Sequence, residues 1–132
     1  MIFVDTNVFM YAVGKKHPRK EQAREFFRAS LRNPDRLCTS AEVLQELLHV
    51  YLATDRLPTF AEAIGFLSDR GISIWPMENE DVDLAHQLHD QFPNLKARDL
   101  CHLASCQRRG VSEVKTYDRN FGEAAESLVR LA

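Results

Sequence analysis

A chain of 132 residues is the size of one ordinary domain, and 45% hydrophobic with 27% charged residues is the composition of a globular protein. The formal net charge of −2 excludes a polybasic nucleic-acid binder, so any contact with nucleic acid must come from a local patch. No apolar stretch approaches the roughly 18 residues that cross a membrane, and the N-terminus lacks the charged lead of a signal peptide, so we expect a cytoplasmic protein.

The first predicted element is a strand at residues 2–4, an unbroken apolar run that ends at Asp5, Thr6 and Asn7. Apolar residues return with helical spacing over 8–13. A strand that is apolar on both faces belongs inside a parallel sheet, whose carboxyl edge is where ligands bind. Asp5 and Asn7 are therefore candidate site residues. The alternative is that Asp5 only ends the strand and that Thr6 or Asn7 only caps the helix.

A second helix is predicted to begin at Pro18, with one buried face formed by Ala23, Phe26, Phe27 and Leu31. Basic residues precede this helix and occupy its first turns: Lys15, Lys16, Arg19, Lys20 and Arg24. They follow the Asp5 turn closely in sequence and could guide a phosphate backbone toward it. A solvated helix surface would have the same composition, so both interpretations stay open.

A turn at 33–35 and a short strand at 37–39 lead to a third predicted helix, which Thr39 and Glu42 would open as a capping box. Its main apolar stripe is expected to be Leu44, Leu47, Leu48 and Tyr51. Glu46 would project opposite that stripe. Because Glu42 already has a structural role, Glu46 is the candidate for chemistry, with a solvent-facing glutamate as the alternative.

Two further helices are predicted by their starting residues. Thr59 and Glu62 repeat the capping-box pattern, and Gly71 ends that fourth helix. After a strand at 72–75, Asn79 would cap a fifth helix whose early acidic residues suit the positive end of the helix dipole. The face of this helix expected to be buried is Val82, Ala85, Leu88 and Phe92.

The C-terminal third contributes two more carboxylates. A helix is predicted from about Arg98 to Arg109, with Asp99 in its first turn, where an aspartate also suits the helix dipole. A strand at 111–117 then ends at Asp118, which could equally be an ordinary turn residue. A short helical turn and an edge strand at 128–131 complete the chain.

Strands and helices alternate throughout, which predicts an α/β three-layer sandwich with a mostly parallel sheet of four to five strands flanked by helices. Asp5 and Asp118 would then end strands at the same edge, and Glu46 and Asp99 could lean over it from helices. At about 5 Å and an effective dielectric constant near 20, each ionised pair costs on the order of 3 kcal/mol. A positive ion is therefore needed, and oxygen ligands without histidine or thiolate favour Mg²⁺ or Mn²⁺.

Four short motifs now point to a known family. They are Asp5-Thr6-Asn7 after residues 2–4, Thr39-Ser40 with Glu46, Ala97-Arg98-Asp99 with His102-Leu103-Ala104, and Thr116 to Phe121. In this order and at these spacings, the chain resembles a PIN-domain protein of the VapC toxin type over nearly its whole length. The resemblance implies a metal-dependent endoribonuclease that is the toxin of a toxin–antitoxin pair, usually a homodimer held inactive by a small antitoxin.

The resemblance also implies roles for individual residues. Asp5, Glu46, Asp99 and Asp118 would be the catalytic acids and the ligands of Mg²⁺ or Mn²⁺, with Asn7 and Thr116 supporting them. In the family's mechanism, metal-bound water attacks the phosphate of RNA and leaves a 5′-phosphate and a 3′-hydroxyl. Substrate-binding candidates are the basic residues Lys15, Lys16, Lys20, Arg98 and Arg119.

Three rival functions remain open from the sequence. A phosphoacceptor receiver domain also places aspartates at strand ends and is expected to carry a lysine near the end of the last strand, where Lys115 is present. It is also expected to carry an acidic pair early in the chain, whereas Asp5 stands alone there. A catalytically inactive PIN fold could act only as a binding module. A structure-specific DNA nuclease uses similar chemistry, but 132 residues leave little room to hold branched DNA.

Overall fold

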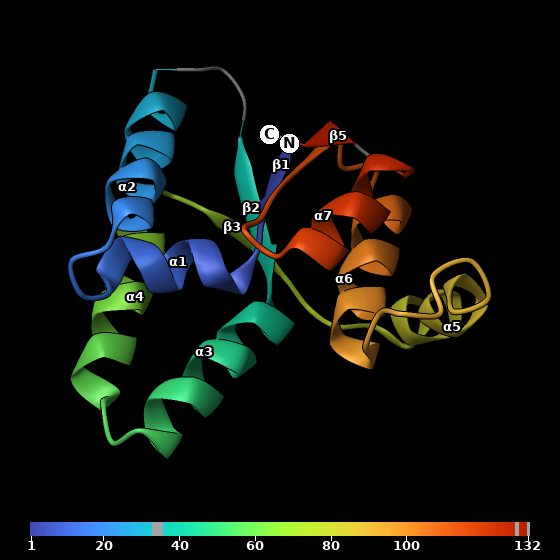
Figure 1. Ribbon diagram of the computed structural model, residues 1–132, viewed down its shortest axis with the longest axis horizontal. Coiled ribbons are helices and arrows are strands. Elements are labelled where there is room, and N and C mark those ends of the chain that lie inside the picture. Colours follow the sequence, from blue (N-terminus) through green and yellow to red (C-terminus); the bar gives the residue numbers. More distant parts are fainter. Residues whose placement is uncertain (33–35, 129, 132) are drawn as a thin grey trace.

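Five parallel strands form the central sheet of the computed structural model (Figure 1). The structure describes residues 1–32, 36–128 and 130–131, so the turn predicted at 33–35 lies outside the described residues. The strand order is β3-β2-β1-β4-β5, and each neighbouring pair is parallel. The bounds are β1 Ile2–Val4, β2 Leu37–Ser40, β3 Ser73–Trp75, β4 Glu113–Lys115 and β5 Arg130–Leu131.

Helices cover both faces of this sheet, as predicted for a three-layer α/β fold (Figure 1). The first layer holds α1 (Thr6–Val13), α2 (Pro18–Ser30) and α4 (Leu57–Asp69). The other layer holds α6 (Ala97–Arg108) and α7 (Arg119–Glu126), with α5 (Asn79–Leu88) packed against α6. The remaining helix, α3 (Ala41–Ala53), leaves the carboxyl end of β2 and contacts α1 and α4. No helix among the described residues is long and apolar enough to cross a membrane.

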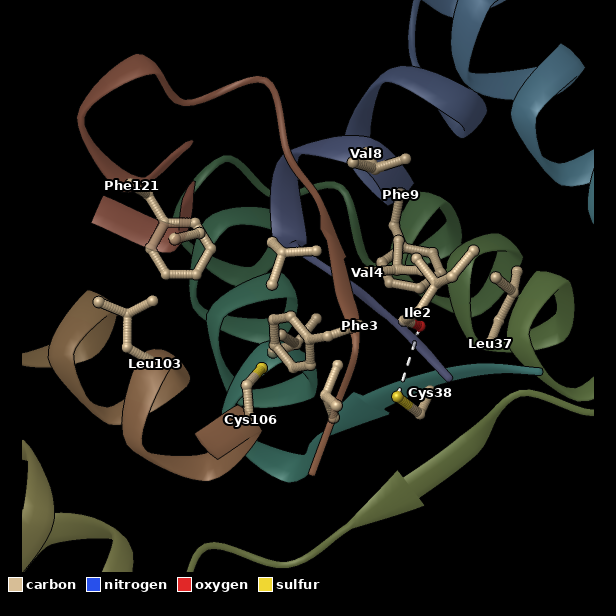
Figure 2. Packing of buried hydrophobic residues seen from close by; sticks show 14 of the residues in the cluster. Ile2, Phe3, Val4, Val8, Phe9, Leu37, Cys38, Leu103, Cys106 and Phe121 are labelled. Carbon is tan, nitrogen blue, oxygen red and sulfur yellow. Dashed lines mark hydrogen bonds between the residues drawn. The ribbon is translucent and has the colours of Figure 1, made fainter. Parts of the chain in front are cut away.

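The core is built around β1, the middle strand of the sheet. Its residues are buried on both faces, as the apolar run predicts. Figure 2 shows Phe3 on the side of Leu103 and Cys106, while Ile2 lies on the side of Phe9. This alternation follows from the two-residue period of a strand. The central position of β1 places the residue that follows it, Asp5, at the middle of one sheet edge.

The predicted starting residues of three helices were wrong by one to three positions. Thr39 belongs to β2 and donates its hydroxyl to the carbonyl oxygen of Val4 at 2.9 Å, so Ser40 caps α3 instead. The strand continues one residue further because Ser40 pairs with Trp75 of β3. Local capping patterns could not reveal this sheet pairing.

The starts of α4 and α5 also differ from the prediction. Thr59 lies inside α4, which begins at Leu57 without a side-chain cap and carries a proline in its first turn. Glu78, rather than Asn79, caps α5 and forms a capping box with Asp81. Asp81 is fully buried, and Arg108 and Arg109 donate to it at 2.7 and 2.8 Å. This acid therefore joins α5 to α6, a role that the helix dipole alone did not predict.

Three predicted core residues are in fact exposed: Leu31 by 67%, Leu48 by 39% and Val82 by 50%. In α3 the buried stripe is Val43, Leu47 and Tyr51. Glu46 is therefore beside the buried stripe and not opposite it, which corrects the prediction for this helix. Helical spacing defines a set of faces, but only the neighbouring helices decide which face they cover.

Candidate active site

All four predicted carboxylates line one hollow with a volume of about 350 Å³. Asp5 follows β1, Asp118 follows β4, and both lie at the carboxyl edge of the sheet. The strand order reverses between β1 and β4, which is where ligands bind in open parallel sheets. Glu46 reaches the hollow from the second turn of α3 and Asp99 from the first turn of α6. Long-range folding thus gathers four acids that are far apart in sequence.

Asp5 is the most buried of the four acids and is held on both carboxylate oxygens. Its Oδ1 accepts the backbone N–H of Thr6 at 2.8 Å, which makes Asp5 the N-cap of α1. Its Oδ2 accepts the hydroxyl of Thr116 at 2.7 Å. Burial raises the pKa of Asp5, and the hydrogen bonds and the nearby His102 oppose this rise only in part.

Asn7 and Thr116 connect the ends of β1 and β4. The side-chain oxygen of Asn7 accepts the backbone N–H of Tyr117 at 3.0 Å, and its amide nitrogen lies 3.4 Å from both Asp5 and Thr116. The hydroxyl oxygen of Thr116 also accepts the backbone N–H of Asp118 at 3.0 Å. Both residues therefore fix the positions of the acids, and only Asn7 lines the hollow itself.

Glu46 is held between two partners. Its Oε2 accepts the hydroxyl of Thr6 at 2.7 Å, and its Oε1 lies 3.0 Å from Nε2 of His102. Burial alone would raise the pKa of Glu46. Its pKa is nevertheless lowered, because burial is outweighed by the hydrogen bond and charge of His102, by the Thr6 hydroxyl and by the charge of Arg98. Glu46 therefore stays a carboxylate while partly buried.

His102 is a site residue to which the sequence assigned no role. Its side chain is 1% exposed and sits in α6 one turn after Asp99, among the rings of Phe3 and Phe121. Because the carboxylate of Glu46 only accepts, Nε2 carries the proton of this bond, and the buried Nδ1 has no partner among the described residues. Burial would lower the pKa of His102, but the bond to Glu46 and the charges of the surrounding acids raise it. A histidine three residues after Asp99 was the available signal, since both lie on one helix face.

Asp99 shows the electrostatic cost of gathering these acids. No hydrogen bond of its carboxylate is present among the described residues, and its side chain is half-buried. Burial and the charges of Asp5, Asp118 and Glu46 raise its pKa to about 6, although His102 partly opposes the rise. Asp118, by contrast, is exposed, and its Oδ1 accepts the backbone N–H of Phe121 as the N-cap of α7.

The donor set fits a hard divalent cation. The side chains facing the hollow offer carboxylate oxygens, which suit Mg²⁺ or Mn²⁺, and the two carboxylate oxygens of Asp99 have no hydrogen-bond partner among the described residues. Within the described residues, no three acidic, histidine or cysteine side chains already form a closed ion cage. Mg²⁺ characteristically keeps several of its own waters, so an open arrangement of this kind is compatible with its binding.

The basic substrate-binding candidates are spread more widely. Arg98 lines the hollow beside the acids. Lys15 is exposed in a neighbouring hollow, and Lys16 is exposed next to it. Lys20 donates to the carbonyl oxygen of Gly14 at 2.8 Å, and Arg119 pairs with a glutamate one turn along α7. The structure therefore brings Arg98 to the acids, while Lys16, Lys20 and Arg119 do not line this hollow.

Comparison with known proteins defines the class of this fold and site. The family described as PIN domain matches residues 2–127. The structure superposes on that of VapC20 from Mycobacterium tuberculosis, a toxin that cleaves the sarcin–ricin loop, with a TM-score of 0.72, 18% identity and coverage of 94% of this chain and 95% of that one. DNA-bound VapBC from Salmonella typhimurium gives a TM-score of 0.74 at 20% identity, over 99% of this chain and 96% of that one. The chain belongs to the PIN-domain family.

Sequence relatives narrow this class. Ribonuclease VapC23 from Mycobacterium tuberculosis is 52% identical over 128 residues, which are 96% of this chain and 100% of that protein. Ribonuclease VapC13 from the same species is 35% identical over 136 residues and 100% of both chains. Within the PIN-domain family, this chain is a VapC ribonuclease, the toxin of a toxin–antitoxin system. This confirms the family predicted from the four motifs and removes the receiver-domain alternative.

Proposed function

We propose that this VapC protein hydrolyses RNA phosphodiesters with Mg²⁺ or Mn²⁺ held among Asp5, Glu46, Asp99 and Asp118. The observation that carries the proposal is the single hollow lined by all four acids, in which burial and the charges of the other three acids raise the pKa of Asp99 to about 6. Such crowding is unfavourable unless a positive group enters the hollow. The same arrangement speaks against an inactive binding module, which would not need it.

When bound, the ion supplies positive charge at the phosphate and makes a water molecule more nucleophilic. The chain's own residues hold the acids ready for this role. Thr6 acts on two of them, because its backbone N–H binds Asp5 and its hydroxyl binds Glu46. Thr116 holds Asp5 from the other strand, and His102 holds the second oxygen of Glu46. Most of the site is therefore oriented before substrate arrives, which lowers the cost of ordering it.

The RNA backbone is proposed to reach the acids across their basic neighbours. Arg98 lies at the hollow and would contact the phosphate, while Lys15 and Lys16 extend the positive surface along the α1–α2 connection. Lys20 and Arg119 are included as weaker contributors, because each already has a partner within the chain. Positive side chains along the path raise the affinity for any RNA, without selecting a sequence.

A small antitoxin and a second copy of this chain are the proposed protein partners, and the cytoplasm is the proposed location. A toxin–antitoxin complex from Klebsiella pneumoniae shares the fold, with a TM-score of 0.69 at 16% identity over 92% of this chain and 90% of that one. Leu48 and Leu52 of α3 and Leu57 of α4 are exposed apolar side chains that a partner could cover. Light scattering of the purified chain, alone and with the product of a small neighbouring reading frame, tests both assemblies.

The decisive experiment is cleavage of total cellular RNA by purified protein, with and without Mg²⁺ or Mn²⁺, followed by mapping of the new ends. We expect cleavage that requires the ion and leaves 5′-phosphates. Asp99→Asn should abolish it, whereas Asp90→Asn, the same change at an exposed turn, should not. Ion-independent cleavage, or full activity of Asp99→Asn, would remove the acids from the mechanism. Cleavage of DNA but not RNA would instead favour the DNA-nuclease alternative.

A further inference from the structure

The hollow that holds the acids adjoins a second hollow of about 340 Å³ on the side of α1. Asn7 and Met10 belong to the walls of both, so the two hollows lie next to each other. The rest of the second hollow comes from the end of α1 and the start of α2: Tyr11, Gly14, Lys15 and His17. A chain-like ligand bound at the acids can therefore continue directly into this space.

Two aromatic rings form one wall of the second hollow. The rings of Tyr11 and His17 lie with their centroids 5.1 Å apart. Tyr11 is held in place, because Arg19 donates to its hydroxyl at 3.1 Å and the ring of Tyr117 meets it edge-on. His17 is exposed but anchored, since its Nδ1 caps α2 by accepting the backbone N–H of Arg19 at 3.1 Å. The wall is thus preorganised although it faces solvent.

Glycine is favoured where the chain passes from α1 to α2. Gly14 ends α1, and a side-chain carbon at this position would lie only 2.7 Å from the carbonyl oxygen of Met10. A larger residue at this position would therefore force the backbone at the end of α1 to shift. Lys15, the next residue, adds one positive charge at the rim. Aromatic faces beside a cation are the elements with which proteins hold single-stranded nucleic acid.

The other side of the hollow that holds the acids differs in chemistry. A third hollow of about 230 Å³ shares Asn94, Leu95 and Asn120 with the hollow of the acids. Its described lining residues include Glu123 and no lysine or arginine. A polyanion would therefore be held more strongly on the side of Tyr11 than on this side.

We propose that the hollow beside Tyr11 and His17 binds one unpaired nucleobase of the RNA, next to the phosphate that is cleaved. The base packs against the two rings, and Lys15 contacts the adjoining phosphate. Bases inside a duplex are paired and stacked on one another, so only a single-stranded segment can present a free base to this wall. The inference rests on the proposed function, and it adds a subsite for one base beside the acids.

The test is an abasic scan with an uncleaved RNA. Asp99→Asn protein is titrated with a fluorescent single-stranded RNA, and then with copies that lack one base at successive positions. We expect one position at which loss of the base weakens binding roughly tenfold, within the range of base–aromatic stacking. The same scan is repeated after Tyr11→Leu and His17→Ser are added. Serine retains the helix cap at position 17 while removing the ring.

The inference requires that base removal and ring removal do not weaken RNA binding independently, so their effects on affinity must not multiply. Once the rings are removed, the affinity should be lower by a similar factor, and the abasic position should have no further effect. Tyr11→Phe, which keeps the ring and loses only the hydroxyl, should retain the position dependence. A salt slope unchanged by ring removal and reduced by Lys15→Ala would support the separate roles of rings and charge.

Two results would overturn the base site. One is that base removal and ring removal lower the affinity by factors that multiply. The other is that ring removal weakens the binding of fully paired RNA as much as that of single-stranded RNA. Failure of the proposed function is read separately, from wild-type cleavage with Mn²⁺. If the wild type cleaves but the scan shows no position dependence, only the base site is wrong. If the scan behaves as expected but no ion supports cleavage, the base site stands and the metal-dependent reaction is wrong.

Discussion

Asp99→Asn should stabilise the metal-free protein near neutral pH while abolishing its ribonuclease activity. The carboxylate of Asp99 has no hydrogen-bond partner among the described residues and faces three other acids across the hollow. Asparagine has nearly the same shape but no charge, so it removes this repulsion without leaving a cavity. A substitution that raises stability and removes activity is the expected result at a site built for an ion.

The magnitude follows from the shifted pKa. A rise from 3.8 to about 6 corresponds to roughly 3 kcal/mol if the group were fully shielded from water. Asp99 is only half-buried, so solvent screening reduces the expected gain to about 1–2 kcal/mol. Between pH 3.8 and about 6 the folded state binds more protons than the unfolded state. Stability from this group therefore falls as pH rises through that window and stays low above it.

Urea denaturation in the presence of a chelator measures this effect. At pH 7.5 the variant should be more stable than the wild type by the amount given above, and near pH 4 the difference should largely disappear. Asp90→Asn, at an exposed turn, controls for the loss of one negative charge from the whole molecule. Added Mn²⁺ should then stabilise the wild type more than Asp99→Asn, because only the wild type keeps all four ligands.

The opposite outcome would refute this reasoning. If Asp99→Asn lowers the free energy of unfolding at pH 7.5, Asp99 makes a favourable interaction that its surroundings do not reveal. If Asp90→Asn produces an equal gain, the effect comes from net charge and not from the hollow. Either result would weaken the argument that the four acids need a cation between them.

Three further predictions concern other parts of the molecule. His102→Leu should lower the free energy of unfolding by about 1–3 kcal/mol and slow cleavage, because Glu46 loses a charge-assisted hydrogen bond. His102→Gln keeps a hydrogen-bond donor, so it should cleave RNA faster than His102→Leu. Equal cleavage rates for the two variants would limit His102 to packing. Asp81→Ala should lower the free energy of unfolding in urea by roughly 2–3 kcal/mol, because Arg109 loses its buried partner. The affinity of this variant for Mn²⁺, measured by calorimetry, should stay unchanged. Neutralising the three lysines of the α1–α2 region together (Lys15, Lys16 and Lys20) should weaken RNA binding and flatten its salt dependence, and an unchanged slope would make them ordinary solvated residues.

Several features of this protein could be read correctly from local patterns. The apolar run at residues 2–4 identified the central strand, because a strand covered on both faces is apolar at successive positions. The alternation of strands and helices identified a parallel α/β sheet, and all strand pairs are parallel. Asp5 and Asp118 were placed together because strand ends in such a sheet share one edge.

Other expectations failed where a distant contact decided the outcome. Thr39 looked like a helix cap, but pairing with β3 keeps the chain extended through the next residue. Leu48 and Val82 have helical spacing that suits a core, yet no neighbouring element covers them among the described residues. The helix dipole alone was expected to account for Asp81, but Arg108 and Arg109 at the end of α6 also bind it.

The amino-acid sequence by itself determined the alternation of strands and helices and the parallel sheet, and it indicated four candidate acids, because these depend on residue type and on spacing within single segments. Only the tertiary structure decided how the acids are held, since Thr6, Thr116 and His102 reach them across 40 to 111 positions of chain. Hydrogen bonds of that separation leave no periodic trace in a sequence. They depend on the packing of α3 and α6 against the edge of the sheet, which is a property of the whole fold.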